Sequence, residues 1–233
     1  MIRRAYVRVS RLGAAALDRL GVLGWLSRRR SPFGRHVYSL FAIYDVDRMI
    51  AVGLPWWTYG AIAEVDDFLS GRRGDVRVFE FGAGASTLWL AERATEVHSV
   101  EHDLSFVQIL EPRLKRHDNV DLRGVEAGER TDDSTAVSER KGHEQLDFAD
   151  YVRTIDDVGG LFDLIVVDGR ARSACLQAAL PHLADDGMVV FDNAGRSRYA
   201  AAIAGSGIEV DVKRGWAPSL PYREATALLR KPA

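Results

Sequence analysis

Apolar and polar positions along the chain alternate in blocks that predict strands and helices in turn. Short runs rich in β-branched and aromatic residues predict buried strands, and apolar residues three and four positions apart predict helices. The predicted strands are residues 76–81, 96–100, 120–125, 162–167 and 187–191. The predicted helices are residues 58–70, 86–93, 104–116, 148–158, 174–183 and 199–205. This order is typical of a parallel sheet with helices on both faces.

The end of the chain breaks the alternation. Two more strands, 208–212 and 225–229, follow each other without a helix between them, so we expect an antiparallel pair at the sheet edge. The predicted fold is therefore α/β: a Rossmann-like, doubly wound sheet of seven strands, mostly parallel, with an antiparallel C-terminal strand pair and an N-terminal helical arm. Residues 126–147 are mostly polar, which predicts a long loop of the kind that forms lids.

The start of the chain differs in charge from the rest. Residues 1–35 carry nine arginines and one aspartate, a net charge of +8, whereas the whole chain carries −2. Leucine and alanine recur at helical spacing between positions 12 and 23, and the interspersed charges exclude a secretory signal and a membrane span. Two interpretations stay open: residues 1–30 form a peripheral contact with an anionic membrane, or the arm packs on its own domain or on a second subunit of a homodimer. The acidic remainder argues against a nucleic-acid partner.

The length of 233 residues suits one α/β domain and this arm. We expect the arm and its linker to span residues 1–54 and the domain to span 55–233. Cys175 is the only cysteine, which excludes an intrachain disulfide and fits a cytoplasmic location, membrane-peripheral if the arm binds lipid. Arginine far outnumbers lysine, which indicates a GC-rich bacterial genome.

The strongest chemical signal is the segment EFGAGAST, residues 80–87, where a glycine loop joins a predicted strand to a predicted helix. Gly82 and Gly84 allow a tight turn and a close approach of the backbone to a ligand. A dinucleotide-binding loop has a third glycine where this chain has Thr87, which argues against a dinucleotide. Glu80 would repel a pyrophosphate but suits an ammonium group, and Glu101, at the end of the second strand, suits ribose hydroxyls. A ligand with an ammonium group, a ribose and no phosphate is S-adenosylmethionine (SAM).

These motifs, together with V-E-H-D at 100–103, D-G at 168–169 and G-M-V-V-F-D-N at 187–193, resemble the class I SAM-dependent methyltransferase superfamily over roughly residues 55–230. The resemblance implies a methyltransferase that binds SAM at the glycine loop and at the acid after the second strand. The predicted cofactor-binding residues are Glu80, Phe81, Gly82, Ala83, Gly84, Ser86, Thr87, Glu101 and His102. Asp103 is a suitable N-cap for the helix that follows.

Asp168, Asp192 and Asn193 follow the fourth and fifth strands, where ligands of such sheets bind. One interpretation is a site for Mg²⁺ or Ca²⁺, because carboxylate and amide oxygens suit these ions. This resembles the cation-dependent O-methyltransferases, but those have a lysine base shortly after the first Asp, where this chain has Arg170 and Arg172. In the other interpretation Asp168 contacts SAM or the acceptor, and Asp192 and Asn193 cap a turn.

Asp168 is the candidate base for an acceptor hydroxyl. Arg170 and Arg172 would either bind an anionic acceptor or pair with the two aspartates. Trp57 and Tyr59, beside Trp56, would either contribute to the substrate site or pack in the core. The predicted function is methyl transfer to a small-molecule or glycan acceptor, at oxygen. The alternatives are an inactive binding module of the same fold and another SAM- or nucleotide-binding enzyme.

Overall fold

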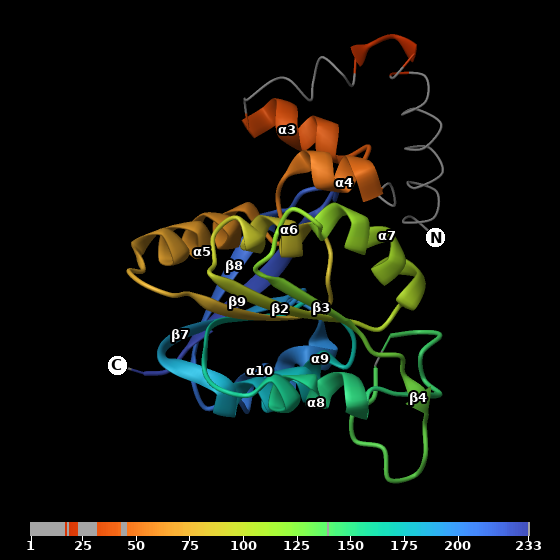
Figure 1. Cartoon of the computed structure of the whole chain (residues 1–233), viewed down its shortest axis with the longest axis vertical. Helices are drawn as coiled ribbons and strands as arrows, with labels where there is room; N and C mark the ends of the chain where they lie inside the picture. Colours follow the sequence, from red (N-terminus) through yellow and green to blue (C-terminus); the bar gives the residue numbers. More distant parts are fainter. Residues whose placement is uncertain (1–16, 18, 23–31, 43–45, 139, 233) are drawn as a thin grey trace.

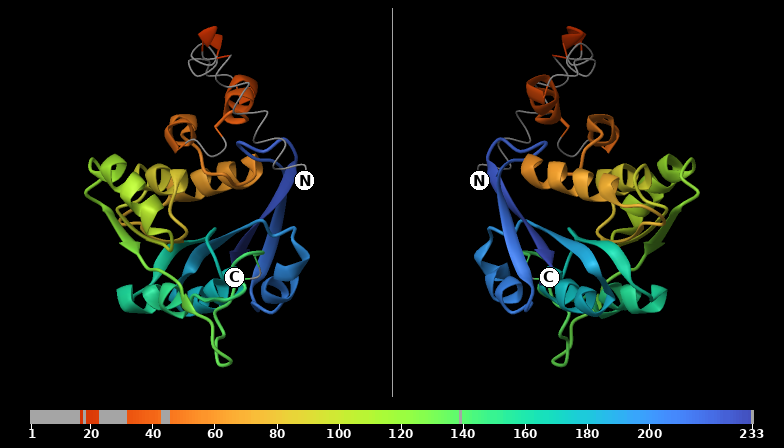
Figure 2. Two further views of the ribbon diagram at one scale, coloured as in Figure 1. Left: turned by 90° about the vertical axis from the view of Figure 1, so that its right-hand side faces the viewer. Right: turned by 90° about the vertical axis from the view of Figure 1, so that its left-hand side faces the viewer.

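A seven-stranded sheet forms the centre of the molecule, with helices on both of its faces (Figures 1 and 2). The computed structural model describes residues 17, 19–22, 32–42, 46–138 and 140–232. The strands of the main sheet are β1 Arg77–Phe81, β2 Glu96–Glu101, β3 Val120–Gly124, β6 Phe162–Val167, β7 Leu183–Asp192, β8 Glu209–Trp216 and β9 Arg223–Arg230. They lie in the order β3-β2-β1-β6-β7-β9-β8. The first five strands in this order are parallel to one another, and β9 is antiparallel to both β7 and β8. The predicted fold class is confirmed.

The helices divide between the two faces according to the alternation of side chains along the strands. The described helices are α3 Pro32–Ser39, α4 Val46–Val52, α5 Tyr59–Gly71, α6 Ala85–Ala91, α7 Leu104–Leu114, α8 Ala149–Val158, α9 Arg172–Ala179 and α10 Ala200–Ala204. Val78 of β1 packs in one core with α5 and α6, and its neighbour Phe79 packs in the opposite core with α8 and α9. Glu80 therefore points to the same face as Val78, toward α6.

Three differences from the sequence prediction have physical causes. Within the predicted loop 126–147, β4 Gly128–Glu129 pairs with β5 Leu146–Asp147, a two-residue ladder too short to show a pattern. Pro181 cannot continue a helix, so α9 ends at Ala179 and a 3₁₀ turn follows at Leu180–His182. Strand β8 continues to Trp216 because β9 pairs with all of it, although most of its residues are exposed.

The predicted arm falls mostly outside the described residues, and so do the interpretations attached to residues 1–30. No helix of the described part of the chain is both long enough and apolar enough to cross a membrane. Helices α3 and α4 lie beyond the layer formed by α5, α6 and α7 (Figure 1).

Candidate active site

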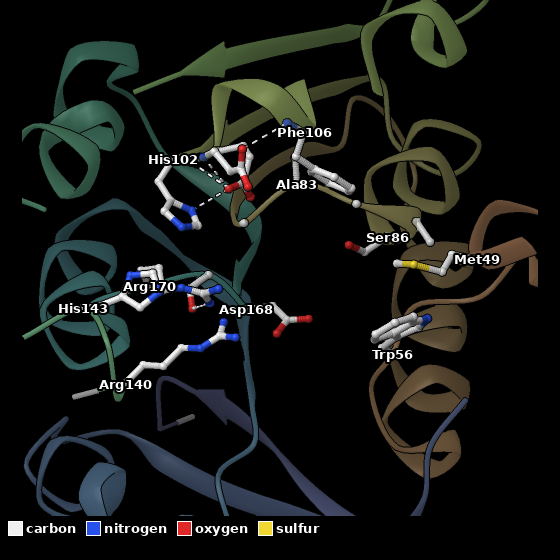
Figure 3. A pocket seen from close by; sticks show the side chains of 16 residues that line it. Met49, Trp56, Ala83, Ser86, His102, Phe106, Arg140, His143, Asp168 and Arg170 are labelled. Atoms are coloured by element: carbon white, nitrogen blue, oxygen red, sulfur yellow. Dashed lines mark hydrogen bonds and ion pairs between the residues drawn. The ribbon is translucent and has the colours of Figure 1, made fainter. Parts of the chain in front are cut away.

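A cavity of about 470 Å³ opens where β1, β2 and β6 end (Figure 3). Parallel strands carry their ligands at this edge of the sheet. One wall is the glycine loop and the other is formed by the residues after β6, with Met49 and Trp56 on a third side (Figure 3). The lining residues are Met49, Trp56, Gly82, Ala83, Gly84, Ala85, Ser86, Glu101, His102, Asp103, Phe106, Arg140, His143, Asp168, Gly169 and Arg170.

The two glycines of the loop serve different purposes. Gly82 has a φ of +98°, and a Cβ built on it would lie 2.6 Å from the Cα of Gly169. The loops after β1 and β6 therefore touch through backbone atoms, and Asp168 N also donates to Phe81 O at 2.9 Å. Gly84 is extended, with a φ of 176°, and a Cβ there would meet no atom within 4 Å. Its missing side chain leaves open space in the cavity.

Glu80 lies beneath the loop. Its side chain is completely buried and accepts hydrogen bonds from three hydroxyls, those of Ser86, Thr87 at 2.5 Å and Ser99 at 2.7 Å. The Thr87 hydroxyl also accepts from the backbone N–H of Gly84 at 2.9 Å. Burial raises the pKa of Glu80 to about 7, against the opposing effect of the hydroxyls. Glu80 does not line the cavity, and it acts by holding the loop in shape.

Glu101 lines the cavity from the end of β2, the strand beside β1. Its Oε1 accepts from the backbone N–H groups of His102 at 2.8 Å and Asp103 at 2.9 Å. Among the described residues, none of the hydrogen bonds to Glu101 uses Oε2, so this oxygen is available to ligand hydroxyls. Asp103 accepts from the N–H groups of Ser105 and Phe106 at the start of α7, which confirms the predicted N-cap.

Asp168 extends into the cavity from the end of β6 (Figure 3). Its Oδ1 lies 2.6 Å from Nη2 of Arg172, whose side chain is only 7% exposed. Asp192 is also close to this guanidinium, with 3.7 Å between its Oδ2 and Nη1 of Arg172. Burial raises the pKa of Asp168 and raises that of Asp192 to about 7, although Arg172 opposes both shifts. Arg172 therefore pairs with the aspartates, as one of the two interpretations predicted.

The residues predicted to hold a divalent cation do not fit one. The guanidinium of Arg172 occupies the space between Asp168 and Asp192, and it supplies the positive charge that a metal would bring. Both carboxylate oxygens of Asp192 already accept hydrogen bonds, from Thr226 Oγ1 at 2.9 Å and from Asn193 Nδ2 at 2.6 Å. Bringing a second cation beside a buried guanidinium is electrostatically unfavourable.

Some predicted site residues lie elsewhere. Trp57 is fully buried and packs edge-on against Trp89, with 6.0 Å between their rings, so the core interpretation applies to it. The hydroxyl of Tyr59 lies 3.1 Å from Nδ1 of His36, away from the cavity lining. Phe81 and Thr87 are buried under the loop and do not line the cavity either.

Other lining residues were absent from the sequence prediction. Arg140 and His143 come from the predicted lid loop, and His143 lies against His102, with 6.0 Å between ring centres. Met49 comes from α4, before the predicted domain boundary at residue 54. No local sequence pattern marks these residues, because the course of a loop or the packing of a helix brings each of them to the cavity. The only signal was the general expectation of a lid over residues 126–147.

Comparisons with known proteins agree with this geometry. Residues 79–194 match the family model described as a methyltransferase domain. A Klebsiella pneumoniae protein provisionally assigned as an O-methyltransferase is 15% identical, with 100% of both chains covered and a TM-score of 0.55. Precorrin 8w decarboxylase from Methanobacterium thermoautotrophicum is 16% identical, with 77% of this chain and 94% of that chain covered and a TM-score of 0.51.

Precorrin-6y C5,15-methyltransferase from Geobacter metallireducens is 14% identical, with 74% of this chain and 88% of that chain covered and a TM-score of 0.51. At these identities the structural likeness shows the fold. No match was found among curated proteins. Together with the family model, the structures confirm the predicted resemblance to the class I SAM-dependent methyltransferases.

Proposed function

We propose that this chain, whose residues 79–194 match the family model described as a methyltransferase domain, transfers a methyl group from SAM to a hydroxyl of a small-molecule or glycan acceptor. One observation carries the proposal: a single cavity has the glycine loop and Glu101 on one side and, on the other, a partly exposed Asp168 whose pKa is raised. The first side suits a nucleoside with an amino-acid tail. The second side suits an acceptor that must lose a proton.

The cofactor-binding part of the proposal uses the glycine loop and Glu101. Gly82 and Gly84 bring backbone groups close to the amino-acid portion of the ligand, while Oε2 of Glu101 accepts from the ribose hydroxyls. SAM supplies an activated methyl group on a positively charged sulfur. Trp56, on the third wall, presents an aromatic ring of the kind that attracts such a cation. Glu80 contributes indirectly, by fixing the loop through Ser86 and Thr87.

The proposed base is Asp168. Its raised pKa makes its carboxylate a stronger proton acceptor than an exposed aspartate, and its ion pair with Arg172 holds it in one orientation. Activity should therefore fall as the pH falls and Asp168 takes up a proton. Much of the rate would come from holding the acceptor oxygen in line with the methyl group. No step is assigned to a metal, because the guanidinium of Arg172 already lies beside both aspartates.

Calorimetry with SAM and S-adenosylhomocysteine tests the cofactor-binding part of the proposal. We expect the native chain to bind both, and Glu101→Ala to bind at least tenfold more weakly because it loses hydrogen bonds to a charged group. Gly84→Val should abolish binding, because the valine side chain would enter the cavity. The substitution should not disturb the fold, because a Cβ at Gly84 meets no atom within 4 Å and the backbone there is extended. Gly215→Val is the matched control, since it too meets no atom within 4 Å and lies on β8, outside the cavity lining. A native chain that binds neither ligand, or a Gly84→Val variant that binds normally, would refute the proposal.

The proposed base needs a separate test once an acceptor is found. Asp168→Asn should leave the affinity for S-adenosylhomocysteine within about threefold and should lower the turnover rate by about 10²- to 10⁴-fold, the usual contribution of a general base. Turnover at the native level in this variant would exclude Asp168 as the base.

A further inference from the structure

A second cavity, of about 500 Å³, adjoins the cofactor cavity. The two share Trp56, Arg140, Asp168, Gly169 and Arg170, so Asp168 lies at their junction. The second cavity continues toward the segment after β7 and toward the connection between β8 and β9. A space of this size accommodates a small organic molecule. Its position beside the proposed base makes it the natural place for the methyl acceptor, so the inference below rests on the proposed function.

The walls of the second cavity are strongly basic. Of the residues that the structure describes, six cationic side chains line it and two carboxylates do, those of Asp168 and Asp192. The cationic residues are Arg140, Lys141, Arg170, Arg172, Arg196 and Arg198. They come in pairs from three separate segments, the lid loop, the residues after β6 and the residues after β7. This concentration is local, because residues 36–233 carry a net charge of −10, given −2 for the chain and +8 for residues 1–35.

For Arg170 and Arg196, ion pairs with described carboxylates do not account for this charge. In the part of the chain that the structure describes, the ion-pair partner of both aspartates is Arg172. Among the described residues, no carboxylate forms an ion pair with Arg170 or Arg196. The Nε of Arg170 is buried without a hydrogen-bond acceptor, and its Nη1 reaches only the carbonyl oxygen of Gly169, at 3.4 Å. A largely buried guanidinium with unused donors is costly unless a ligand supplies the acceptors.

The type of anion follows from the number and kind of cations. One carboxylate has a single charge and two oxygens, which one arginine can satisfy. Several guanidinium groups around one cavity match a phosphate or diphosphate group, with its higher charge and larger number of oxygens. Trp56, Tyr199 and Tyr222 complete the wall and provide ring surfaces for the uncharged part of a ligand.

We infer that the second cavity is the acceptor site and that the acceptor carries a phosphate or diphosphate group, bound by Arg196 and its basic neighbours while a hydroxyl of the same molecule lies at Asp168. Arg196 is the residue that best isolates this role. It lines the second cavity only, whereas Arg140 and Arg170 line both cavities and would also affect SAM.

Binding of inorganic pyrophosphate to the full chain, measured by calorimetry at fixed ionic strength, tests the inference. The native chain should bind one equivalent, and Arg196→Gln should bind at least tenfold more weakly because it loses a charge-assisted contact. Arg196→Lys should fall between the two, since it keeps the charge but loses the planar fork. Arg73→Gln is the matched control, because it removes the same charge from an exposed residue between α5 and β1 and should bind within twofold of the native chain.

S-adenosylhomocysteine is titrated into the same proteins to separate the two proposals. Its normal binding to Arg196→Gln would show that this variant is folded. If the native chain binds S-adenosylhomocysteine but not pyrophosphate, the acceptor inference fails and the proposed function stands. If it binds pyrophosphate but not S-adenosylhomocysteine, the proposed function fails, and the second cavity is a phosphate site without a role in methyl transfer. The inference would be overturned if Arg73→Gln and Arg196→Gln lost equal affinity for pyrophosphate. It would also be overturned if the native chain bound malonate or a short RNA more tightly than pyrophosphate.

Discussion

Glu80 makes the stability of this protein depend on pH in a direction that is unusual for an acid. Its side chain is fully buried, and its pKa in the folded state is about 7, against an ordinary value of 4.5. The folded state therefore binds the Glu80 proton more tightly than the unfolded state does. The contribution of Glu80 to stability is fully present below pH 4.5 and is lost as the pH rises through about 7. A shift from 4.5 to about 7 corresponds to roughly 3 kcal/mol.

The substitution Glu80→Gln isolates this effect, because glutamine has nearly the same shape and does not titrate. Urea unfolding of the native chain and of the variant at pH 5, 6, 7 and 8 gives the free energy of unfolding of each. The native chain should lose about 2.5 kcal/mol relative to the variant between pH 5 and pH 8, because a small part of the effect is already lost at pH 5. The pKa of Asp192 is also raised to about 7, but this residue is present in both proteins and its effect cancels in the difference. Parallel pH profiles for the two proteins would refute the assignment of the raised pKa to Glu80.

Four further predictions concern other parts of the structure. Gly82→Ala should lower the free energy of unfolding by about 2–4 kcal/mol, because its Cβ would meet the backbone of Gly169 and its φ is positive. Gly84→Ala should change the free energy of unfolding by less than about 0.5 kcal/mol. Urea unfolding compares the two variants, and equal effects would contradict the loop geometry. Arg172→Met should destabilise the fold by about 3 kcal/mol at pH 8, because Asp168 and Asp192 are left without a counter-charge. The destabilisation should be smaller at pH 5, where Asp192 is protonated. An effect that does not change with pH in urea unfolding would contradict this prediction. Millimolar Mg²⁺ or Ca²⁺ should leave the melting temperature unchanged and a chelator should leave S-adenosylhomocysteine binding unchanged, whereas stabilisation by either ion would restore the metal interpretation. If residues 1–30 bind anionic membranes, the full chain should float with phosphatidylserine-containing liposomes and a chain lacking these residues should not; flotation of both or of neither would favour a role within the protein itself.

The fold and the cofactor motif were predictable because both depend on short-range patterns. The buried strands are short apolar runs, and the glycine loop occupies consecutive residues, so Gly82, Gly84 and Glu101 could be selected without a structure. The N-cap at Asp103 was predictable for the same reason. The absence of a helix between β8 and β9 was enough to predict their antiparallel pairing.

The orientation of single side chains outside regular elements was not predictable. Trp56 and Trp57 are adjacent, yet only Trp56 lines the cavity, and a loop has no periodicity that would tell them apart. The sequence showed Glu80 and the hydroxyl residues after it, but whether they face a ligand or one another depends on the turn at Gly82. Long-range pairs such as Asp192 with Thr226 depend on which strands become neighbours in the sheet.

The contact between Gly82 and Gly169 makes the distance between the two loops of the site insensitive to substitutions elsewhere in the protein. The loops after β1 and β6 meet through main-chain atoms, so no side chain acts as a spacer between them. Core residues on either face of the sheet can be exchanged for others of similar volume, and this spacing has no side chain through which to change. The distance between the proposed methyl donor and the proposed proton acceptor is therefore set by the peptide backbone. Side chains of the acceptor pocket can change in evolution without altering that distance.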